Sequence, residues 1–304
     1  MNDIILRTTH LGKKYRERWA AQDINLEVHR GDVFGLLGPN GAGKSTTIRM
    51  ILSLIKPTTG GVELFGHDLY RNRESALQNV AGIVEKPDFY LYLSAFRNMQ
   101  IAGSMTLGKT PDSKKIMDTL ALVGLVERAL DKVKTYSHGM KQRLGIAQAL
   151  LTDPQLVMLD EPTNGLDPQG MKEVRELIKQ LTEERGITVL LSSHLLNEVE
   201  QVATRMAIIN KSTMVVQGTV SDLLKANAHK VLFKVSPVKK ALMLLQKNKH
   251  VKDPEVSDDG IMAQVDPKHI PAVTAALVEA RCKIFGIEAR HSLEEYFLSI
   301  TNNQ

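Results

Sequence analysis

The sequence is poor in cysteine and has no long apolar run. Its single cysteine, Cys282, cannot form an internal disulfide, and without a partner thiol it cannot build a cysteine zinc site. No stretch approaches the roughly 18 to 20 consecutive apolar residues that span a bilayer. Residues 1–7 also lack the basic start, apolar core and cleavage site of a signal peptide. These absences, with 43% hydrophobic and 24% charged residues, predict a globular protein of the cytoplasm.

The chain also lacks a long segment of one charge sign. A net charge of +5 invites a nucleic-acid interpretation, but the densest basic run, residues 13–18, is interrupted by Glu17. Dispersed charge of this kind is typical of a solvated surface, and it also fits mild attraction to an anionic membrane surface. We therefore expect no nucleic acid among the partners.

Short apolar runs alternate with helical patterns over the longer first part of the chain. Three runs are typical of buried strands, and a helical pattern separates the last two. This alternation predicts an α/β fold with a mainly parallel sheet that helices cover on both faces. Residues 94–151 have mostly helical spacing. The predicted strands are 33–37, 156–159 and 187–191, and the predicted helix between the last two is 169–184.

The pattern changes near Lys225, so that 304 residues divide into a large domain and a small appendage. Residues 226–304 carry no ligand motif and predict an α+β domain of the ferredoxin-like kind. Its predicted strands are 231–235, 261–265 and 283–288, its predicted helices are 238–246, 270–280 and a short one from Ser292, and 253–260 is predicted as turns.

A phosphate-binding motif stands between the first buried strand and a helical pattern. It satisfies G-x-x-x-x-G-K-[ST] in full, in the strand–loop–helix context that the motif requires. Its glycines let backbone N–H groups turn inward at a helix N-terminus, where the helix dipole favours an anion. We therefore expect ATP as the ligand. The motif runs Gly38-Pro39-Asn40-Gly41-Ala42-Gly43-Lys44-Ser45-Thr46.

The side chains of this loop have separate expected roles. Pro39 has no N–H, so the cradle is expected to come from the amides of residues 41–46. Lys44 is expected to contact the β- and γ-phosphates, and the Ser45 hydroxyl to bind Mg²⁺.

Two acidic residues, Asp160 and Glu161, follow the second buried strand. Asp160 is placed to hold Mg²⁺, as a carboxylate does in phosphate-loop nucleoside triphosphatases. Glu161 is the candidate general base that polarises the attacking water. The alternative is that Glu161 only caps a turn.

Four further segments resemble motifs of the ATP-binding subunits of ABC transporters. Residues 137–142 resemble the signature motif, residues 166–168 the D-loop and residues 192–194 the segment that ends in the switch histidine. Tyr15 stands near the position of the aromatic residue that stacks on adenine. Taken singly, Ser137 could be only a helix cap, His194 only a polar residue at a strand end and Tyr15 only a surface aromatic. Together with the phosphate loop and the Asp160–Glu161 pair, these segments occur in the order that the family has along the chain. The resemblance then covers residues 1–225.

The resemblance implies a P-loop ABC cassette with a mixed sheet and a helical subdomain over about residues 89–150. It implies that Ser137 and Gly139 contact the γ-phosphate of ATP held by a second, identical subunit, and that His194 takes part in catalysis. It also implies an integral membrane permease as partner, with the subunit on the inner face of the membrane. The apolar residues that begin at Phe89 could contact that permease or form the subdomain's own core.

Two departures from the family pattern narrow the resemblance. The signature has His138 and Met140 where the family has glycine and glutamine, and Glu85 stands at the position of the Q-loop glutamine, where a carboxylate can still bind Mg²⁺. These changes, and residues 293–297, resemble antibiotic exporters of the bacitracin and lantibiotic self-protection type. Two alternatives remain at this point, which are an importer subunit and a soluble ABC-type ATPase that acts on ribosomes or nucleic acid.

Overall fold

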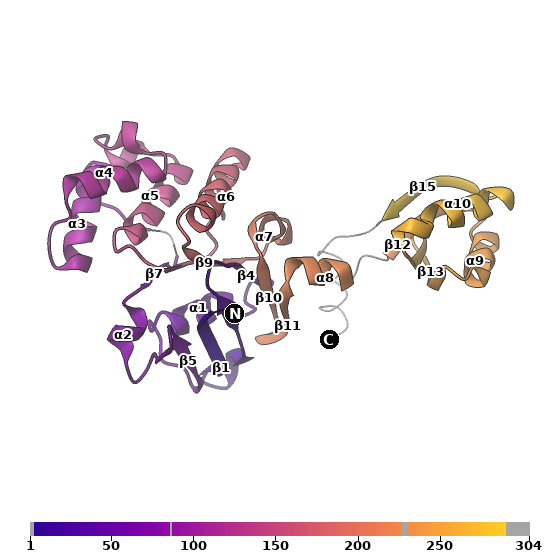
Figure 1. The fold of residues 1–304 in the computed structure, drawn as a ribbon, viewed down its shortest axis with the longest axis horizontal. Coiled ribbons are helices and arrows are strands. Elements are labelled where there is room, and N and C mark those ends of the chain that lie inside the picture. Colours follow the sequence, from indigo (N-terminus) through magenta and orange to yellow (C-terminus); the bar gives the residue numbers. More distant parts are fainter. Residues whose placement is uncertain (1–2, 86, 227–229, 290–304) are drawn as a thin grey trace. The chain divides into compact units, whose positions relative to one another are not determined.

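The computed structural model describes residues 3–85, 87–226 and 230–289. The chain divides into two compact units, residues 1–218 and residues 219–304, which are described separately below (Figure 1). No helix among the described residues is long and apolar enough to cross a membrane.

The first unit is built on a mixed sheet of eleven strands in the order β6-β5-β1-β2-β11-β10-β4-β9-β8-β7, with β3 paired to β1. Strand β1 runs antiparallel to β2, β3 and β5, whereas β10, β4, β9, β8 and β7 form a parallel series. The sheet is therefore mixed, as the resemblance implies. The strands are β1 (Ile4–Tyr15), β2 (Arg18–Ile24), β3 (Glu27–His29), β4 (Val33–Leu37), β5 (Thr59–Leu64), β6 (His67–Asp68), β7 (Val80–Ile83), β8 (Leu156–Leu159), β9 (Thr188–Ser193), β10 (Arg205–Asn210) and β11 (Thr213–Thr219).

The parallel strands bring three loops to one edge of the sheet. Every residue of β4, β8 and β9 is buried, because parallel strands are covered on both faces. The register aligns Leu37 with Ser193 and Leu159 with Leu191. The carboxyl ends of these strands therefore place the phosphate loop, the Asp160–Glu161 pair and the segment that ends in His194 side by side.

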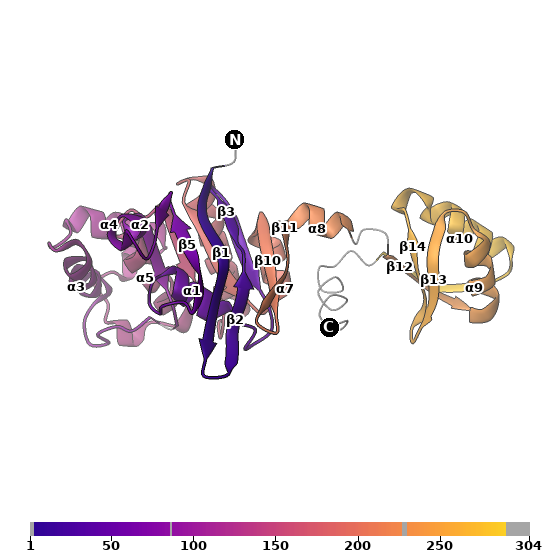
Figure 2. The same ribbon diagram turned by 90° about the horizontal axis from the view of Figure 1, so that it is seen from below.

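Helices cover this sheet and also form a separate subdomain (Figures 1 and 2). Helices α3, α4 and α5 pack on one another, and α5 also packs on α6 and β7. The side chains of Ser94, Ser137 and Asp167 cap the N-termini of α3, α5 and α6. The helices are α1 (Lys44–Ile51), α2 (Arg73–Leu77), α3 (Ala95–Leu107), α4 (Ser113–Leu122), α5 (His138–Leu150), α6 (Pro168–Glu183) and α7 (Leu196–Val202), with 3₁₀ turns η1 (Val126–Arg128) and η2 (Val133–Thr135).

The second unit has the element order βαββαβ after a first helix, and its antiparallel sheet has the strand order β13-β14-β12-β15. This is the arrangement of a ferredoxin-like fold. Its apolar core includes Phe233, Leu245, Ile261 and Leu277. The elements are α8 (Val220–Ala226), β12 (Lys230–Ser236), α9 (Val238–Lys247), β13 (Val251–Ser257), β14 (Gly260–Val265), η3 (Pro267–His269), α10 (Ile270–Glu279) and β15 (Lys283–Ala289).

One sequence expectation for this unit is wrong. Most of the stretch predicted as turns, 253–260, belongs to strand β13. This strand lies at the sheet edge and its register shifts between Lys252 and Glu255, around Pro254. Edge strands tolerate proline and polar residues, so composition concealed the strand. The predicted helix from Ser292 and residues 293–297 lie outside the described residues.

Candidate functional site: the phosphate loop and its carboxylates

The phosphate loop leaves β4 and enters α1 with two glycines in the left-handed region. Gly41 has φ 81° and Gly43 has φ 112°. A Cβ atom at Gly43 would stand 2.3 Å from the Ala20 carbonyl oxygen, so no larger residue fits there without moving backbone. The close approach of β2 and the positive φ together explain why glycine occupies this position.

Most of the predicted loop residues line one cavity of about 220 Å³. Its lining comprises Asn40, Gly41, Gly43, Lys44, Ser45 and Thr46 with Ala20, Glu161 and Asn164. Gly38 and Ala42 do not line it. The Ala42 N–H donates to the Pro39 carbonyl at 3.1 Å, so this amide closes the turn instead of facing the cavity, contrary to the expected cradle.

Sequence reasoning missed Ala20 and Asn164. Ala20 lies on β2, which no local motif connects with the loop, and Asn164 follows the carboxylate pair by only a few residues. A larger cavity of about 590 Å³ lies elsewhere, between α4 and the turn before β9, and contains none of the predicted site residues.

The Lys44 ammonium is buried and held from three sides. Its Nζ atom donates to the carbonyls of Gly38 at 2.7 Å and Pro39 at 3.3 Å, and it stands 3.2 Å from Glu161 Oε1. The lysine that follows the last glycine of the loop therefore faces the carboxylate that follows β8. Tertiary structure brings these two predicted catalytic residues into direct contact.

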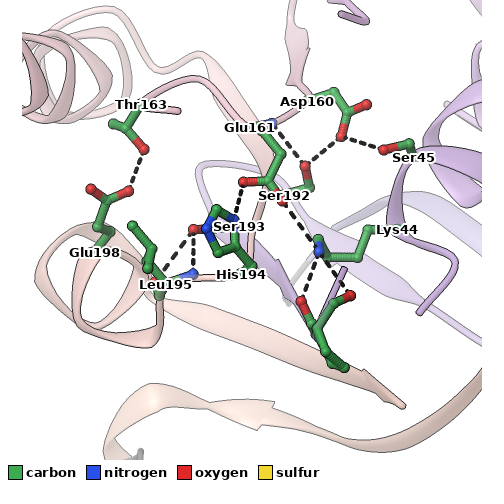
Figure 3. A network of polar contacts seen from close by, with 12 residues as sticks. Lys44, Ser45, Asp160, Glu161, Thr163, Ser192, Ser193, His194, Leu195 and Glu198 are labelled. Atoms are coloured by element: carbon green, nitrogen blue, oxygen red, sulfur yellow. Dashed lines mark hydrogen bonds and ion pairs between the residues drawn. The ribbon is translucent and has the colours of Figure 1, made fainter. Parts of the chain in front are cut away.

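Ser192 joins the Asp160 carboxylate and the Glu161 backbone to the end of β9 (Figure 3). Its hydroxyl donates to Asp160 Oδ1 at 2.6 Å and accepts from the Glu161 N–H at 2.9 Å. The Ser45 hydroxyl donates to the same Asp160 oxygen at 3.0 Å. Two of the three predicted Mg²⁺ ligands, Ser45 and Asp160, thus meet in one network. Ser192, which the sequence analysis treated only as part of the switch segment, orients Asp160.

Glu161 also contacts the predicted switch histidine. His194 Nδ1 lies 2.8 Å from Glu161 Oε2, so the carboxylate stands between an ammonium and an imidazole (Figure 3). Glu161 has φ 50°, a left-handed conformation uncommon for a non-glycine residue. Behind it, the Thr163 hydroxyl donates to Glu198 of α7, which ties the loop to the next helix.

The signature residues lie at the start of α5 and do not line the cavity. The Ser137 hydroxyl accepts the Met140 N–H at 3.2 Å, in the geometry of a helix cap. His138 Nδ1 lies 3.1 Å from the Gly165 carbonyl, which links the signature to the loop before α6. A Cβ atom at Gly139 would stand 3.6 Å from Gly170 of α6.

Two further predicted residues have other partners. Tyr15 ends β1, is half exposed and has the Lys13 ammonium 5.2 Å from its ring centre. Glu85, with φ 70°, follows β7 and pairs with Arg49 of α1, whereas Asp160 pairs with Ser45. No cluster of three acidic, histidine or cysteine residues that could hold a metal occurs among the described residues.

Comparison with known proteins agrees with this arrangement. A family described as ABC transporter matches residues 21–164. The bacitracin transport ATP-binding protein BcrA of Bacillus licheniformis is 40% identical, over 97% of this chain and 97% of its own length. The uncharacterized ABC transporter ATP-binding protein YhcH of Bacillus subtilis is 39% identical, over 98% of this chain and 96% of its own.

Solved structures lead to the same family. The structure of an ATP-binding subunit of an ABC transporter superposes with a TM-score of 0.63 and 29% identity, over 73% of this chain and 92% of that one. The phosphate loop, the carboxylates and His194 lie together at one sheet edge, and relatives match nearly the whole chain. The chain therefore belongs to the ATP-binding subunits of ABC transporters.

Proposed function

We propose that this subunit hydrolyses ATP to drive export of antimicrobial peptides, antibiotics or similar compounds through a separate integral membrane permease. The observation that carries the proposal is the position of Glu161, whose carboxylate lies at the phosphate-loop cavity between Lys44 and His194. A carboxylate held in this way can accept a proton from water in a site that already contains a phosphate-binding loop.

The loop residues would hold the nucleotide. The amides of residues 43–46 stand at the start of α1, where backbone N–H groups and the helix dipole favour phosphate oxygens. Lys44 would exchange its carbonyl and carboxylate contacts for phosphate oxygens, and Tyr15 would stack on adenine. Bound Mg²⁺ supplies charge neutralisation at the phosphates, and the hydroxyl of Ser45 and the carboxylate of Asp160 are oxygen donors of the kind it prefers. Glu85 is a third candidate ligand.

The second carboxylate would do the proton chemistry. Glu161 would orient and deprotonate the attacking water, and His194, hydrogen-bonded to Glu161 Oε2, would keep the carboxylate in place. Ser192 would fix the backbone of Glu161 through its 2.9 Å bond to that N–H.

Each site would be completed by a second copy of the subunit. The cavity of about 220 Å³ is smaller than the roughly 300–1,000 Å³ of typical ligand pockets, which suits half of a composite site. Ser137 and Gly139 stand at a helix N-terminus outside that cavity, where they could contact the γ-phosphate of ATP on a partner subunit. A homodimer would then contain two such sites.

The direction of transport is proposed from the relatives. BcrA is named for bacitracin transport, and its similarity extends through the second unit of this chain. This favours an exporter over an importer, and a transport role over action on ribosomes or nucleic acid. The subunit would then lie on the inner face of the cell membrane, bound to its permease.

Glu161→Gln tests the hydrolysis proposal. The amide cannot accept the proton, so we expect turnover to fall by about 10²–10⁴-fold while ATP still binds and holds the dimer together. Phosphate release and gel filtration with ATP measure the two effects. Glu183→Gln, an exposed acid at the end of α6, is the matched control. Equal turnover in the two variants would refute the role of Glu161.

A further inference from the structure

The second unit contains a cavity of about 290 Å³ that none of the phosphate-site motifs contributes to. It is formed by the turn before β13, the first residues of β13, the end of β14 and η3. The lining residues are Lys249, His250, Lys252, Gln264, Asp266 and His269. Five of the six carry titratable side chains, which is unusual for a cavity that serves only packing.

The backbone explains why these residues meet. Antiparallel pairing of β13 with β14 sets Lys252 opposite Gln264. Asp266 then caps η3 by accepting the Lys268 N–H at 3.1 Å. These two constraints bring His250 and His269 together as stacked rings with centres 3.8 Å apart and planes 24° apart.

The cavity has an excess of positive charge. Asp266 is its one acidic residue, and it already pairs with the Lys268 ammonium at 3.0 Å. Lys249 and Lys252 form no ion pair with any residue that the structure describes. Two unpaired ammonium groups therefore share this cavity with two imidazoles that can each gain a proton.

The ionisation of His250 is consistent with this excess. Partial burial lowers its pKa below the ordinary 6.5, and the nearby His269, Lys249 and Lys268 lower it further. Neighbouring cations disfavour another positive charge at His250. The same electrostatic potential favours an anion in the space between them.

We propose that this cavity is a binding site for a phosphate group, carried either by a free phosphate ion or by an anionic lipid headgroup. Lys249 and Lys252 would supply charge, and the stacked imidazoles of His250 and His269 would donate hydrogen bonds after taking up protons. The site lies wholly within the second unit and its ligand is separate from the ATP of the phosphate loop.

Proton uptake gives the proposal a signature that a purely structural pair of histidines lacks. An anion in the cavity stabilises the protonated rings, so it raises the pKa of both histidines. Binding then strengthens as pH falls through the histidine range. The groups that line the cavity or act on His250 are Lys249 in the turn before β13, Lys252 of β13, Gln264 of β14, and Asp266 with Lys268 at η3.

Histidine ring NMR signals of the full-length chain test binding of free phosphate. The signals of His250 and His269, assigned with single His→Gln variants, are titrated with pH in phosphate and in chloride at equal ionic strength. We expect phosphate to raise both pKa values. The double variant Lys249→Gln/Lys252→Gln should lose most of this rise, whereas Lys239→Gln/Lys240→Gln, with two exposed lysines at the other end of α9, should retain it.

Sedimentation with vesicles tests the lipid source. Phosphatidylcholine vesicles with and without phosphatidic acid are compared for the same variants. If a headgroup is the ligand, the Lys249→Gln/Lys252→Gln pair should weaken binding to the acidic vesicles by about thirtyfold, since each lysine near such a surface contributes about fivefold. An effect of phosphate alone identifies a free ion, and an effect of vesicles alone identifies a headgroup. If both variants respond equally in both assays, the proposal is wrong.

Discussion

Replacing Ser192 with alanine should separate stability from catalysis at this site. Ser192 is fully buried at the end of β9, where it donates to Asp160 at 2.6 Å and accepts from the Glu161 N–H at 2.9 Å. Removal of the hydroxyl leaves the Glu161 N–H without this acceptor, and leaves Asp160 with Ser45 as its remaining hydroxyl partner. Both carboxylates of the proposed reaction are then less constrained.

The two lost hydrogen bonds set the expected magnitude. A hydrogen bond to a charged group contributes about 1.5–3 kcal/mol and a neutral one about 0.5–1.5 kcal/mol. We therefore expect Ser192→Ala to lower the free energy of unfolding of the first unit by about 2–4.5 kcal/mol. We also expect slower ATP turnover at unchanged expression, because Glu161 and Asp160 lose the group that orients them.

The single tryptophan makes the measurement specific. Trp19 lies on β2, so its fluorescence in a urea titration reports unfolding of the first unit alone. Thr188→Val is the matched control, since it removes a buried hydroxyl from the opposite end of the same strand, where Thr188 accepts the Gly31 N–H at 2.9 Å. This control should lose stability and keep turnover. Unchanged turnover in Ser192→Ala would refute the positioning role.

The structure also sets the direction of the effect expected from three further substitutions. Glu85→Ala breaks an exposed pair with Arg49, so stability should change by less than about 1 kcal/mol. If Glu85, at the position of the Q-loop glutamine, couples the ATP site to the permease, transport should fall more than nucleotide binding, and equal transport would count against this coupling. Gly35→Ala would set a Cβ 2.2 Å from Val199 Cγ1 and should cost about 1–3 kcal/mol in urea titrations, with partial recovery on adding Val199→Ala. Burial and the charge of Asp68 raise the pKa of Tyr70 from 10.0 to about 12, so the folded first unit should lose stability as pH rises through that interval. Tyr70→Phe should flatten this alkaline dependence, and an unchanged slope would show that Tyr70 is not its source.

Local patterns in the sequence were sufficient for much of the fold and the site. Buried strands β4 and β8 are continuous apolar runs and β9 is largely apolar, and six of the nine residues of the contiguous phosphate-loop motif line one cavity. The order of motifs also indicated the family, which the relatives confirm. Such features can be predicted from sequence because hydrophobic periodicity and loop motifs depend on only a few neighbouring residues.

Tertiary structure alone decided which distant groups touch. The parallel register of β4, β8 and β9 places Ser192 against Asp160 and brings His194 to Glu161. Ala20 reaches the same cavity from β2, which lies elsewhere in the sheet. Tertiary contacts also pair Glu85 with Arg49 and stack His250 on His269 in the second unit. They make an edge strand, β13, of a polar stretch. The sequence by itself determined the chemistry that is available, whereas strand pairing between distant segments decided where that chemistry meets, because long-range register is set by the whole core and not by any local pattern.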